Sequence, residues 1–274
     1  MGLPPIGTLW IGSELGPVEQ LCLASMVANG HEVTLYAYGP VLRVPEGVRL
    51  ADAASVLPPD RVFRHHRVGS PAVFADIFRI EMILQTGRVW LDTDILLLAP
   101  FAFEDPVVLD GERDREGRLL ANNCVMKVPQ DSDLLRALAA YVREPGRILP
   151  LLPRSKAARL LLRRLARGAW PLDRFPWGAF GFTIITHELK ARGLMGHVVA
   201  DGRSLPGKLA LFEPHRFGPE VVEQAMFAHF TSSKFARNRI DFDRPEDGSV
   251  YRLAVERFGP GTPYFRSGRP GREA

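Results

Sequence analysis

The pattern of hydrophobic and polar residues near the start of the chain predicts a strand, a helix and a second strand. Residues 8–12 form a short apolar run, and residues 32–38 alternate hydrophobic and polar side chains with the period of two typical of a strand. Between them, residues 18–29 predict a helix, because Pro17 stands at its start and Gly30 follows its end. A strand–helix–strand unit builds parallel sheets, so we predict an α/β protein.

Similar signals continue along the rest of the chain. Further helices are predicted at residues 70–85, 133–143, 155–167 and 180–192. Strands are predicted at residues 88–92 and 119–128, with an apolar continuation at 95–98 and a late strand or loop at 225–230. We see no repeat and no long linker, so a single domain over residues 1–259 is the simplest organisation. Residues 260–274, rich in Gly, Pro and Arg, are expected to be a loose tail.

Composition narrows the class of protein. The 274 residues are 46% hydrophobic and 24% charged, which suffices for a sizeable core and excludes a disordered chain. Only two cysteines are present, Cys22 and Cys124, so a disulfide scaffold is excluded and a reducing compartment is favoured. No apolar run reaches the ~18 residues of a membrane span, and residues 1–5 do not resemble a signal peptide. We therefore expect a cytoplasmic protein. Its net charge of +4 suits anionic ligands or a lipid surface but does not indicate nucleic acid.

One of three Asp-x-Asp triplets stands out by its surroundings. Asp131 and Asp133 precede a predicted helix and are expected to cap it, and the triplet that begins at Asp241 is expected to lie in a solvated loop. Asp92 and Asp94 instead lie between two apolar runs, where carboxylates are costly unless paired or bound to a cation. If the chain is extended there, both side chains face one side and would converge on Mg²⁺ or Mn²⁺. The alternative is a strand end with two structural aspartates.

The helix before this triplet carries a second polar pair. Asp76 and Arg79 are three residues apart and share a face, while an apolar stripe points elsewhere. The pair is either a surface ion pair, worth ~0–1 kcal/mol, or a ligand-binding pair at the carboxyl edge of the sheet.

Together these residues resemble a known family. Residues 75–81 (ADIFRIE), Gly87 and residues 89–94 (VWLDTD) are similar to the signature of DXD-containing glycosyltransferases of the family 32 type, which are related to α-1,4-glycosyltransferases and yeast mannosyltransferases. The usual pattern is S-D-x-x-R-Y followed by G-G-x-Y-x-D-x-D. Ala75, Arg88 and Trp90 depart from it at the Ser, the second Gly and the Tyr. All charged signature residues are retained.

The resemblance implies a GT-A fold, a Rossmann-like nucleotide-sugar-binding sheet flanked by helices, with Mn²⁺ or Mg²⁺ held by Asp92 and Asp94 and with Thr93 contacting the nucleotide sugar. It also implies that Asp76 and Arg79 contact the donor, and that Trp10, Ile11 and Gly12 lie near its base. The resemblance further implies a retaining enzyme that uses a nucleotide sugar, often UDP-linked, as donor and a glycan or a lipid-linked molecule as acceptor.

A later segment resembles the family's H-x-x-x-S-W stretch. His229 matches the His that helps bind the metal or diphosphate, while Lys234 stands where the family has Trp. His229 is either a ligand or a structural residue, and Lys234 either approaches a phosphate or is solvated.

The chemistry expected of such a site is stabilisation of a leaving nucleoside diphosphate by the metal. The sequence identifies no nucleophile or general base. Asn122 and Asn123 are candidates to hydrogen-bond an acceptor hydroxyl, with a turn as the alternative.

Two other functions remain open from the sequence. An Asp-nucleophile phosphohydrolase also places Asp-x-Asp after an apolar strand. Its motif has Thr or Val two residues after the second Asp, where this chain has Leu96. A peripheral-membrane binding module would rest on residues 155–167. There Lys156, Arg159, Arg163 and Arg167 form a basic stripe opposite Ala158, Leu161, Leu162 and Leu165. The segment would then dock on the inner face of an anionic membrane; alternatively, its leucines pack on the core.

Overall fold

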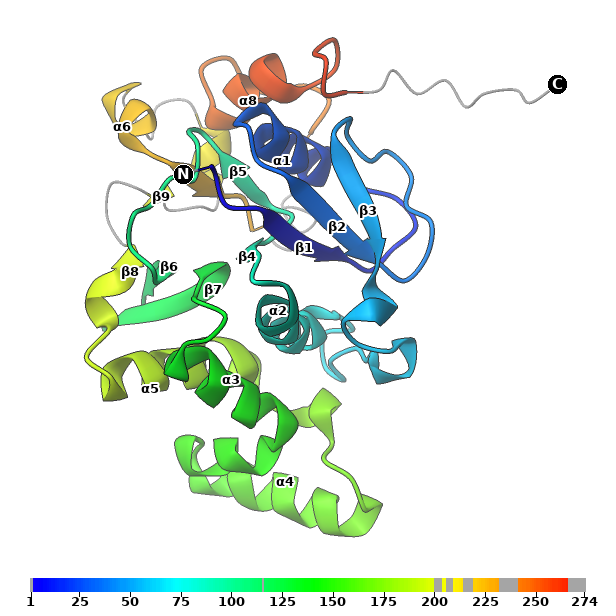
Figure 1. The fold of residues 1–274 in the computed structure, drawn as a ribbon, viewed down its shortest axis with the longest axis vertical. Coiled ribbons are helices and arrows are strands. Elements are labelled where there is room, and N and C mark those ends of the chain that lie inside the picture. The colour runs from blue at the N-terminus through cyan, green and yellow to red at the C-terminus, as the bar shows by residue number, and fades with distance from the viewer. Residues whose placement is uncertain are drawn as a thin grey trace, which may run out of the picture. The chain divides into compact units, whose positions relative to one another are not determined.

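A computed structural model describes residues 2–114, 116–199, 204–205, 209–213, 219–231 and 241–265 (Figure 1). These residues form two compact units, each made from more than one stretch of chain. The first unit comprises the described residues within 1–52, 91–104 and 200–274, and the second those within 53–90 and 105–199. The predicted α/β class is confirmed, since both units combine strands with helices. The predicted single domain over residues 1–259 stays a prediction.

The first unit begins with the predicted strand–helix–strand arrangement. Strand β1 (Ile6–Trp10) pairs in parallel with β2 (Val33–Ala37), and β2 pairs in parallel with β3 (Val48–Asp52). Helix α1 (Pro17–Ala28) connects β1 to β2 and has Pro17 in its first turn. The first two strands are almost wholly buried, which is typical of a parallel sheet covered on both faces.

A small second sheet in the same unit is built from distant parts of the sequence. Strand β10 (Phe227–His229) pairs antiparallel with β5 (Ile95–Leu97) and parallel with β9 (Ser204–Leu205). Among the described residues, helices α6 (Pro219–Gln224) and α8 (Val250–Phe258) also belong to this unit. A hydrophobic core joins α1, β5, β10 and α8; among its fully or nearly fully buried members are Leu21, Cys22, Leu96, Ala228, Phe230, Tyr251 and Ala254.

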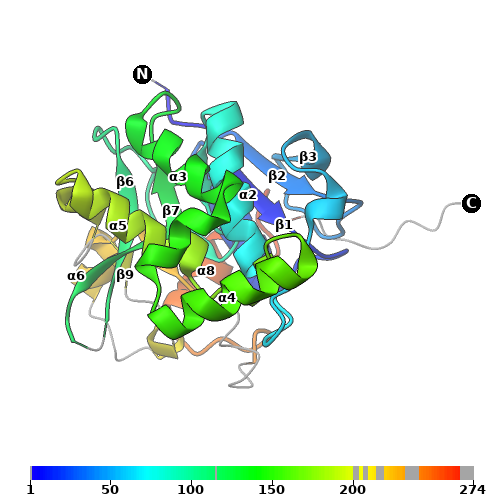
Figure 2. The ribbon, with the colours of Figure 1, turned by 90° about the horizontal axis from the view of Figure 1, so that it is seen from below.

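The second unit packs helices beside an antiparallel pair of strands. Strand β7 (Leu119–Lys127) pairs antiparallel with β6 (Val108–Arg113), and β6 pairs in parallel with β8 (Val198–Val199). Helix α2 (Ala72–Thr86) packs on α3 (Asp133–Arg143), which in turn packs on α5 (Ile184–Ala191) (Figure 2). Helix α4 (Arg154–Arg167) packs on the 3₁₀ segment Pro145–Leu151. The boundary between the units passes through β4 (Val89–Leu91).

The helices begin and end near the capping residues that the sequence predicted. Gly87 ends α2 with φ of 66°, a left-handed conformation that glycine adopts without strain. At the start of α2, the Ser70 hydroxyl accepts a hydrogen bond of 3.2 Å from the Ala72 N–H. Ser132 caps α3 by accepting from the Leu135 N–H, so the expected cap falls on the residue between Asp131 and Asp133. None of the described helices has both the length and the apolar character that crossing a bilayer requires.

Candidate functional site

Asp92 and Asp94 lie in a tight turn between strands β4 and β5. The sequence argument assumed an extended chain at this point, and that assumption is wrong. The Ile95 N–H donates a hydrogen bond of 3.0 Å to the Asp92 carbonyl, which closes a turn around Thr93. The two carboxylates still converge, because the turn brings their oxygens together. All three turn residues are half-buried.

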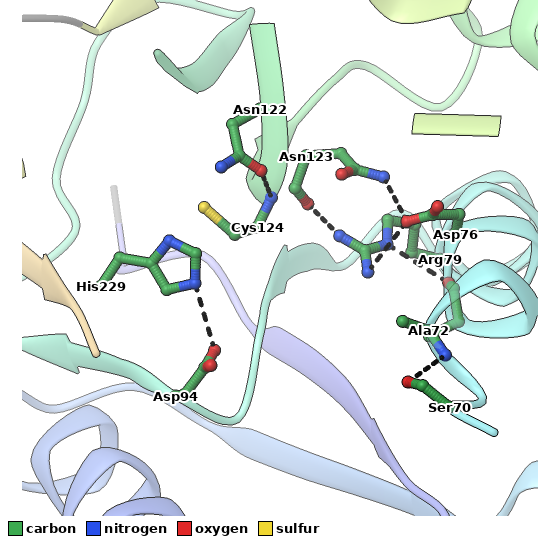
Figure 3. Close-up of polar contacts among 10 residues, drawn as sticks. Ser70, Ala72, Asp76, Arg79, Asp94, Asn122, Asn123, Cys124 and His229 are labelled. Carbon is green, nitrogen blue, oxygen red and sulfur yellow. Dashed lines mark hydrogen bonds and ion pairs between the residues drawn. The ribbon is translucent and has the colours of Figure 1, made fainter. Parts of the chain in front are cut away.

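His229 completes a group of three metal-ligating side chains. It lies at the end of β10 and pairs in register with Ile95, the residue after Asp94. Its Nε2 lies 3.6 Å from Asp94 Oδ1 (Figure 3). One ligand atom from each of Asp92, Asp94 and His229 lies within 4.8 Å of the others. We call these three residues the Asp/His group.

The backbone around this group is fixed from two directions. The Phe230 N–H donates to the Asp94 carbonyl at 3.0 Å. On the other edge of β5, the buried Ser25 hydroxyl accepts from the Leu97 N–H at 2.9 Å, and the Asn29 amide donates to the Leu97 carbonyl at 3.1 Å. Helix α1 and strand β10 therefore both hold the strand that begins directly after Asp94.

The donor set of the Asp/His group suits a divalent cation. Ligand atoms around one small cation, each about 2.1 Å from it, lie about 3 to 4 Å apart, which is near the spacing seen here. Two carboxylates supply the hard oxygens that Mg²⁺ and Mn²⁺ prefer, and imidazole is accepted more readily by transition metals than by Mg²⁺. The group is therefore a candidate metal centre.

The second unit holds the other polar cluster, on α2. Arg79 Nη2 lies 3.4 Å from Asp76 Oδ1, and the two side chains are only 5% and 13% exposed. The interpretation as a surface ion pair is therefore wrong, because both charges are nearly out of water. Arg79 also donates through Nε to the Ala75 carbonyl and lies over the Trp90 ring, 4.8 Å from its centroid.

Asn123 links both members of this pair. Its side-chain amide donates to Asp76 Oδ1 at 2.9 Å, and its backbone carbonyl accepts from Arg79 Nη1 (Figure 3). Burial raises the pKa of Asp76 above its usual range, although Arg79 and the Asn123 amide oppose the shift. We call Asp76, Arg79 and Asn123 the buried triad. The sequence predicted the first two as partners, but it held no signal that Asn123 and Trp90 would enclose them.

Asn122 and Asn123 lie inside strand β7, so the alternative that places them in a turn is wrong. Both are buried, at 8% and 4% exposure. Asn122 Oδ1 accepts from the Cys124 N–H at 3.1 Å. Their expected role toward an acceptor stays a prediction.

Trp10, Ile11 and Gly12 follow the end of β1. The Trp10 indole N–H donates to the Glu14 carbonyl at 3.1 Å, which folds the loop back on itself. A Cβ on Gly12 would meet that indole nitrogen at 2.9 Å, so the loop requires a glycine there unless the ring moves. Ile11 is half-buried and Gly12 exposed.

The aspartates of the other two Asp-x-Asp triplets lie outside both clusters. Asp133 forms an exposed ion pair with Arg136, and Asp241 is exposed and accepts a hydrogen bond from the Asp243 N–H. Lys234 lies outside the described residues. Cys22 is buried, and burial together with the charge of Asp94 raises its thiol pKa well above the ordinary value, so it remains protonated.

Comparisons with known proteins find a likeness in fold but not in sequence. No protein-family model matches the chain, and no curated protein matches it by sequence. The fold is similar to that of a solved structure of PaToxG glycosyltransferase, with a TM-score of 0.44 and 12% sequence identity over 70% of each chain. At this score and identity the likeness assigns no role to any residue of this chain.

Proposed function

We propose that this protein is a metal-dependent glycosyltransferase that moves a sugar from a nucleotide-sugar donor to an acceptor. The observation that carries the proposal is the convergence of Asp92, Asp94 and His229 into one group of potential ligands. The resemblance seen in the sequence suggested this role for all three residues, although His229 lies 135 positions after Asp94 and 137 after Asp92.

The Asp/His group is proposed to hold Mn²⁺ or Mg²⁺. When bound, the cation would stabilise negative charge on the leaving diphosphate as a Lewis acid. Asp92 and Asp94 contribute the oxygens and two negative charges, and the antiparallel pairing of β5 with β10 keeps His229 beside them. The affinity of such ligands alone would favour several other transition metals over Mg²⁺. Mg²⁺ and Mn²⁺ are proposed because both cations bind the phosphate oxygens of a nucleotide sugar well.

The buried triad is proposed to contribute to donor binding through Asp76 and Arg79. Arg79 is held on three sides, by Asp76, by the Asn123 carbonyl and by the Trp90 ring. A guanidinium fixed in this way loses little conformational freedom when it binds an anionic or polar group. We extend the proposal to Trp10, Ile11, Gly12, Thr93 and Lys234 as donor contacts and to Asn122 and Asn123 as acceptor contacts.

The finer chemistry follows the resemblance seen in the sequence. We propose a UDP-sugar donor carrying a hexose, transfer with retention of configuration, and a glycan or lipid-linked acceptor. The described residues offer no nucleophile or general base for which the geometry gives a role.

Thermal unfolding tests the proposal directly. UDP, GDP and inorganic phosphate are each added with and without Mn²⁺, and the unfolding temperature is compared. A ligand at 100 times its Kd stabilises the folded state by about 2.7 kcal/mol. We expect stabilisation by one nucleoside diphosphate only when Mn²⁺ is present. A screen of nucleotide sugars for metal-dependent donor hydrolysis then identifies the donor. Stabilisation by phosphate alone, with phosphatase activity, would instead support the phosphohydrolase.

The chain provides a matched control for the metal ligands. Asp92→Asn and Asp94→Asn remove a charge from the Asp/His group, and Asp241→Asn and Asp243→Asn remove one from an exposed triplet of the same pattern. Metal-dependent stabilisation and turnover should be lost only in the first pair. Near wild-type turnover in a folded Asp92→Asn or Asp94→Asn protein would contradict the assignment of that residue. Asp76→Ala and Arg79→Ala should weaken donor binding measured by calorimetry.

A further inference from the structure

Helix α4 presents hydrophobic side chains to solvent. Leu161, Leu162 and Leu165 are 46%, 66% and 73% exposed, whereas Leu160 is 2% exposed. At 100° per residue, Leu162 lies about 160° around the helix from Leu160. The side of α4 that packs on the protein is therefore marked by Leu160, and the three exposed leucines lie on the side that faces away. The interpretation in which these leucines pack on the core is wrong.

The exposed leucines form a continuous apolar strip. Leu161 and Leu165 are four residues apart, and Ala158 and Leu162 are also four apart, so each pair lies one helical turn apart on the same side. Ala158 is exposed as well. Exposed leucines are unremarkable singly, but three on one helix make a patch that soluble surfaces seldom carry without a use.

Basic side chains occupy the other side of the helix from this strip. Lys156, Arg159, Arg163 and Arg167 recur there every three or four residues, and Arg159, about 60° around the helix from Leu162, lies nearest to the strip. Between Glu144 and Asp173 the sequence has seven Lys and Arg residues and no acidic residue. Within the described part of the chain, the one ion pair made by α4 joins Arg167 to Asp173 at 3.8 Å, so most of this charge is available to a partner.

We propose that α4 docks the protein on an anionic lipid bilayer. An apolar strip with cations on the other side of the same helix is the pattern of helices that lie in the plane of the membrane, with the leucines among the acyl chains and the cations at the acidic headgroups. A second copy of the chain is a poorer occupant, because it would place another helix with the same excess of positive charge beside this one. The helix is about 21 Å long, too short to cross the hydrocarbon core. Docking is therefore peripheral and reversible.

The contributions of the two kinds of side chain can be separated. A Lys or Arg close to an anionic surface strengthens binding about fivefold, and this gain falls as salt screens the charges. Burial of the leucines depends little on salt but requires insertion below the headgroups. Binding that needs both anionic lipid and the leucines is the signature of α4 lying at the interface.

Vesicle flotation tests the proposal with the full-length protein. Vesicles of phosphatidylcholine alone are compared with vesicles that contain about one third phosphatidylserine, at low and at high salt. We expect recovery with the anionic vesicles at low salt and at least a tenfold loss at high salt. Equal recovery with both vesicle types, or no recovery with either, overturns the proposal.

Paired variants show which surface is responsible. Arg159→Gln, Arg163→Gln and Arg167→Gln together should reduce partitioning about 100-fold, and Leu162→Ser with Leu165→Ser at least about tenfold. Leu42→Ser removes a leucine that is 63% exposed in the first unit, and it should leave partitioning unchanged, as should Arg49→Gln with Arg257→Gln. An effect of the control variants equal to that of the α4 variants overturns the assignment to α4.

A site-specific probe provides a second readout. Both native cysteines are buried, so an environment-sensitive dye attached through Leu162→Cys labels α4 selectively. Its emission should shift to the blue with anionic vesicles, whereas a dye attached through Leu42→Cys should not respond. Binding without a shift at position 162 would mean that an acidic surface attracts the protein without insertion, and it overturns the proposal. Vesicle binding needs neither donor nor metal, so it tests α4 independently of the proposed transferase activity.

Discussion

The side-chain amide of Asn123 on β7 donates a hydrogen bond of 2.9 Å to the carboxylate of Asp76 on α2. This bond opposes the effect of burial, which raises the pKa of Asp76. Asn123→Ala should therefore raise that pKa further and lower the free energy of unfolding by about 1–3 kcal/mol at neutral pH. Urea denaturation at a series of pH values measures both effects.

The pH dependence separates this contact from simple packing. Asn123 stabilises the ionised carboxylate, so the deficit of Asn123→Ala should grow as pH rises through the raised pKa that Asp76 has in the folded protein, and it should be smallest below that pKa. Asn122→Ala is the matched control, because Asn122 bonds to the Cys124 N–H and not to a carboxylate. Deficits of equal pH dependence in the two variants would argue against the role given to Asn123.

His229 should tune which metal the protein prefers. Loss of groups that only surround metal ligands costs 10–100-fold in affinity, so loss of the ligand itself through His229→Ala should weaken Mn²⁺ binding at least about tenfold. Mg²⁺, which prefers oxygen, should lose less. Calorimetric titration with each metal measures the ratio. A variant that binds both metals as the wild type does would show that His229 is structural.

His31 should make the first unit sensitive to acid. Its Nδ1 lies 2.9 Å from the Pro4 carbonyl, and its Nε2 accepts from the Phe101 N–H at 3.0 Å. This pattern requires a neutral ring, and burial lowers the pKa of His31 below its usual range. The unfolded chain therefore binds the proton more readily, so stability should fall as pH drops below about 6.5, with a slope of up to about 1.36 kcal/mol per pH unit.

The slope assigned to His31 can be removed by substitution. His31→Gln should flatten the stability curve between pH 7.5 and 5.5, while lowering stability overall because the two hydrogen bonds are disturbed. His187→Gln, at an exposed position on α5, controls for the loss of one histidine. If the slope survives in His31→Gln, acid sensitivity has another source.

Two ion pairs in the second unit should differ strongly in strength. Arg143 on α3 binds both oxygens of Glu81 on α2 at 3.0 Å, and the Glu81 side chain is only 8% exposed. Arg143→Ala would leave a buried carboxylate without this partner, and it should cost about 1–2 kcal/mol after allowance for the exposure of Arg143. The pair between Arg147 and Glu144 is exposed on both sides, so Arg147→Ala should change the free energy of unfolding much less than Arg143→Ala. Equal losses in the two variants would contradict this ranking.

Local signals in the sequence predicted much of the fold because they act within a few residues. Gly87 ends α2 and Pro17 begins α1 as expected. Helix α8 was not predicted, although a signal was present: Ser249 caps it by accepting from the Arg252 N–H. Strand β6 was not predicted either, since Asp110 and Gly111 interrupt its hydrophobic pattern.

The candidate site was predictable in its members but not in its geometry. Asp92 and Asp94 were expected to converge along an extended chain, whereas a turn brings them together. The bond between Asn123 and Asp76 joins residues 47 positions apart, and periodicity carries no information about such contacts. The sequence also did not predict that Arg79 is buried. The spacing of three residues between Asp76 and Arg79 indicates that the two side chains are neighbours on the helix, but it does not indicate which other element covers them.

The pairing of β5 with β10 also determines when the Asp/His group can form during synthesis of the chain. A ribosome makes Asp92 and Asp94 early, yet His229 is the 135th residue that it adds after Asp94. Until then the nascent chain has two carboxylates and no imidazole beside them, and β5 lacks the strand that pairs with it. The Asp/His group is thus among the last parts of the first unit to assemble, and a chain cut short before Phe227 would keep both aspartates without the means to complete the group.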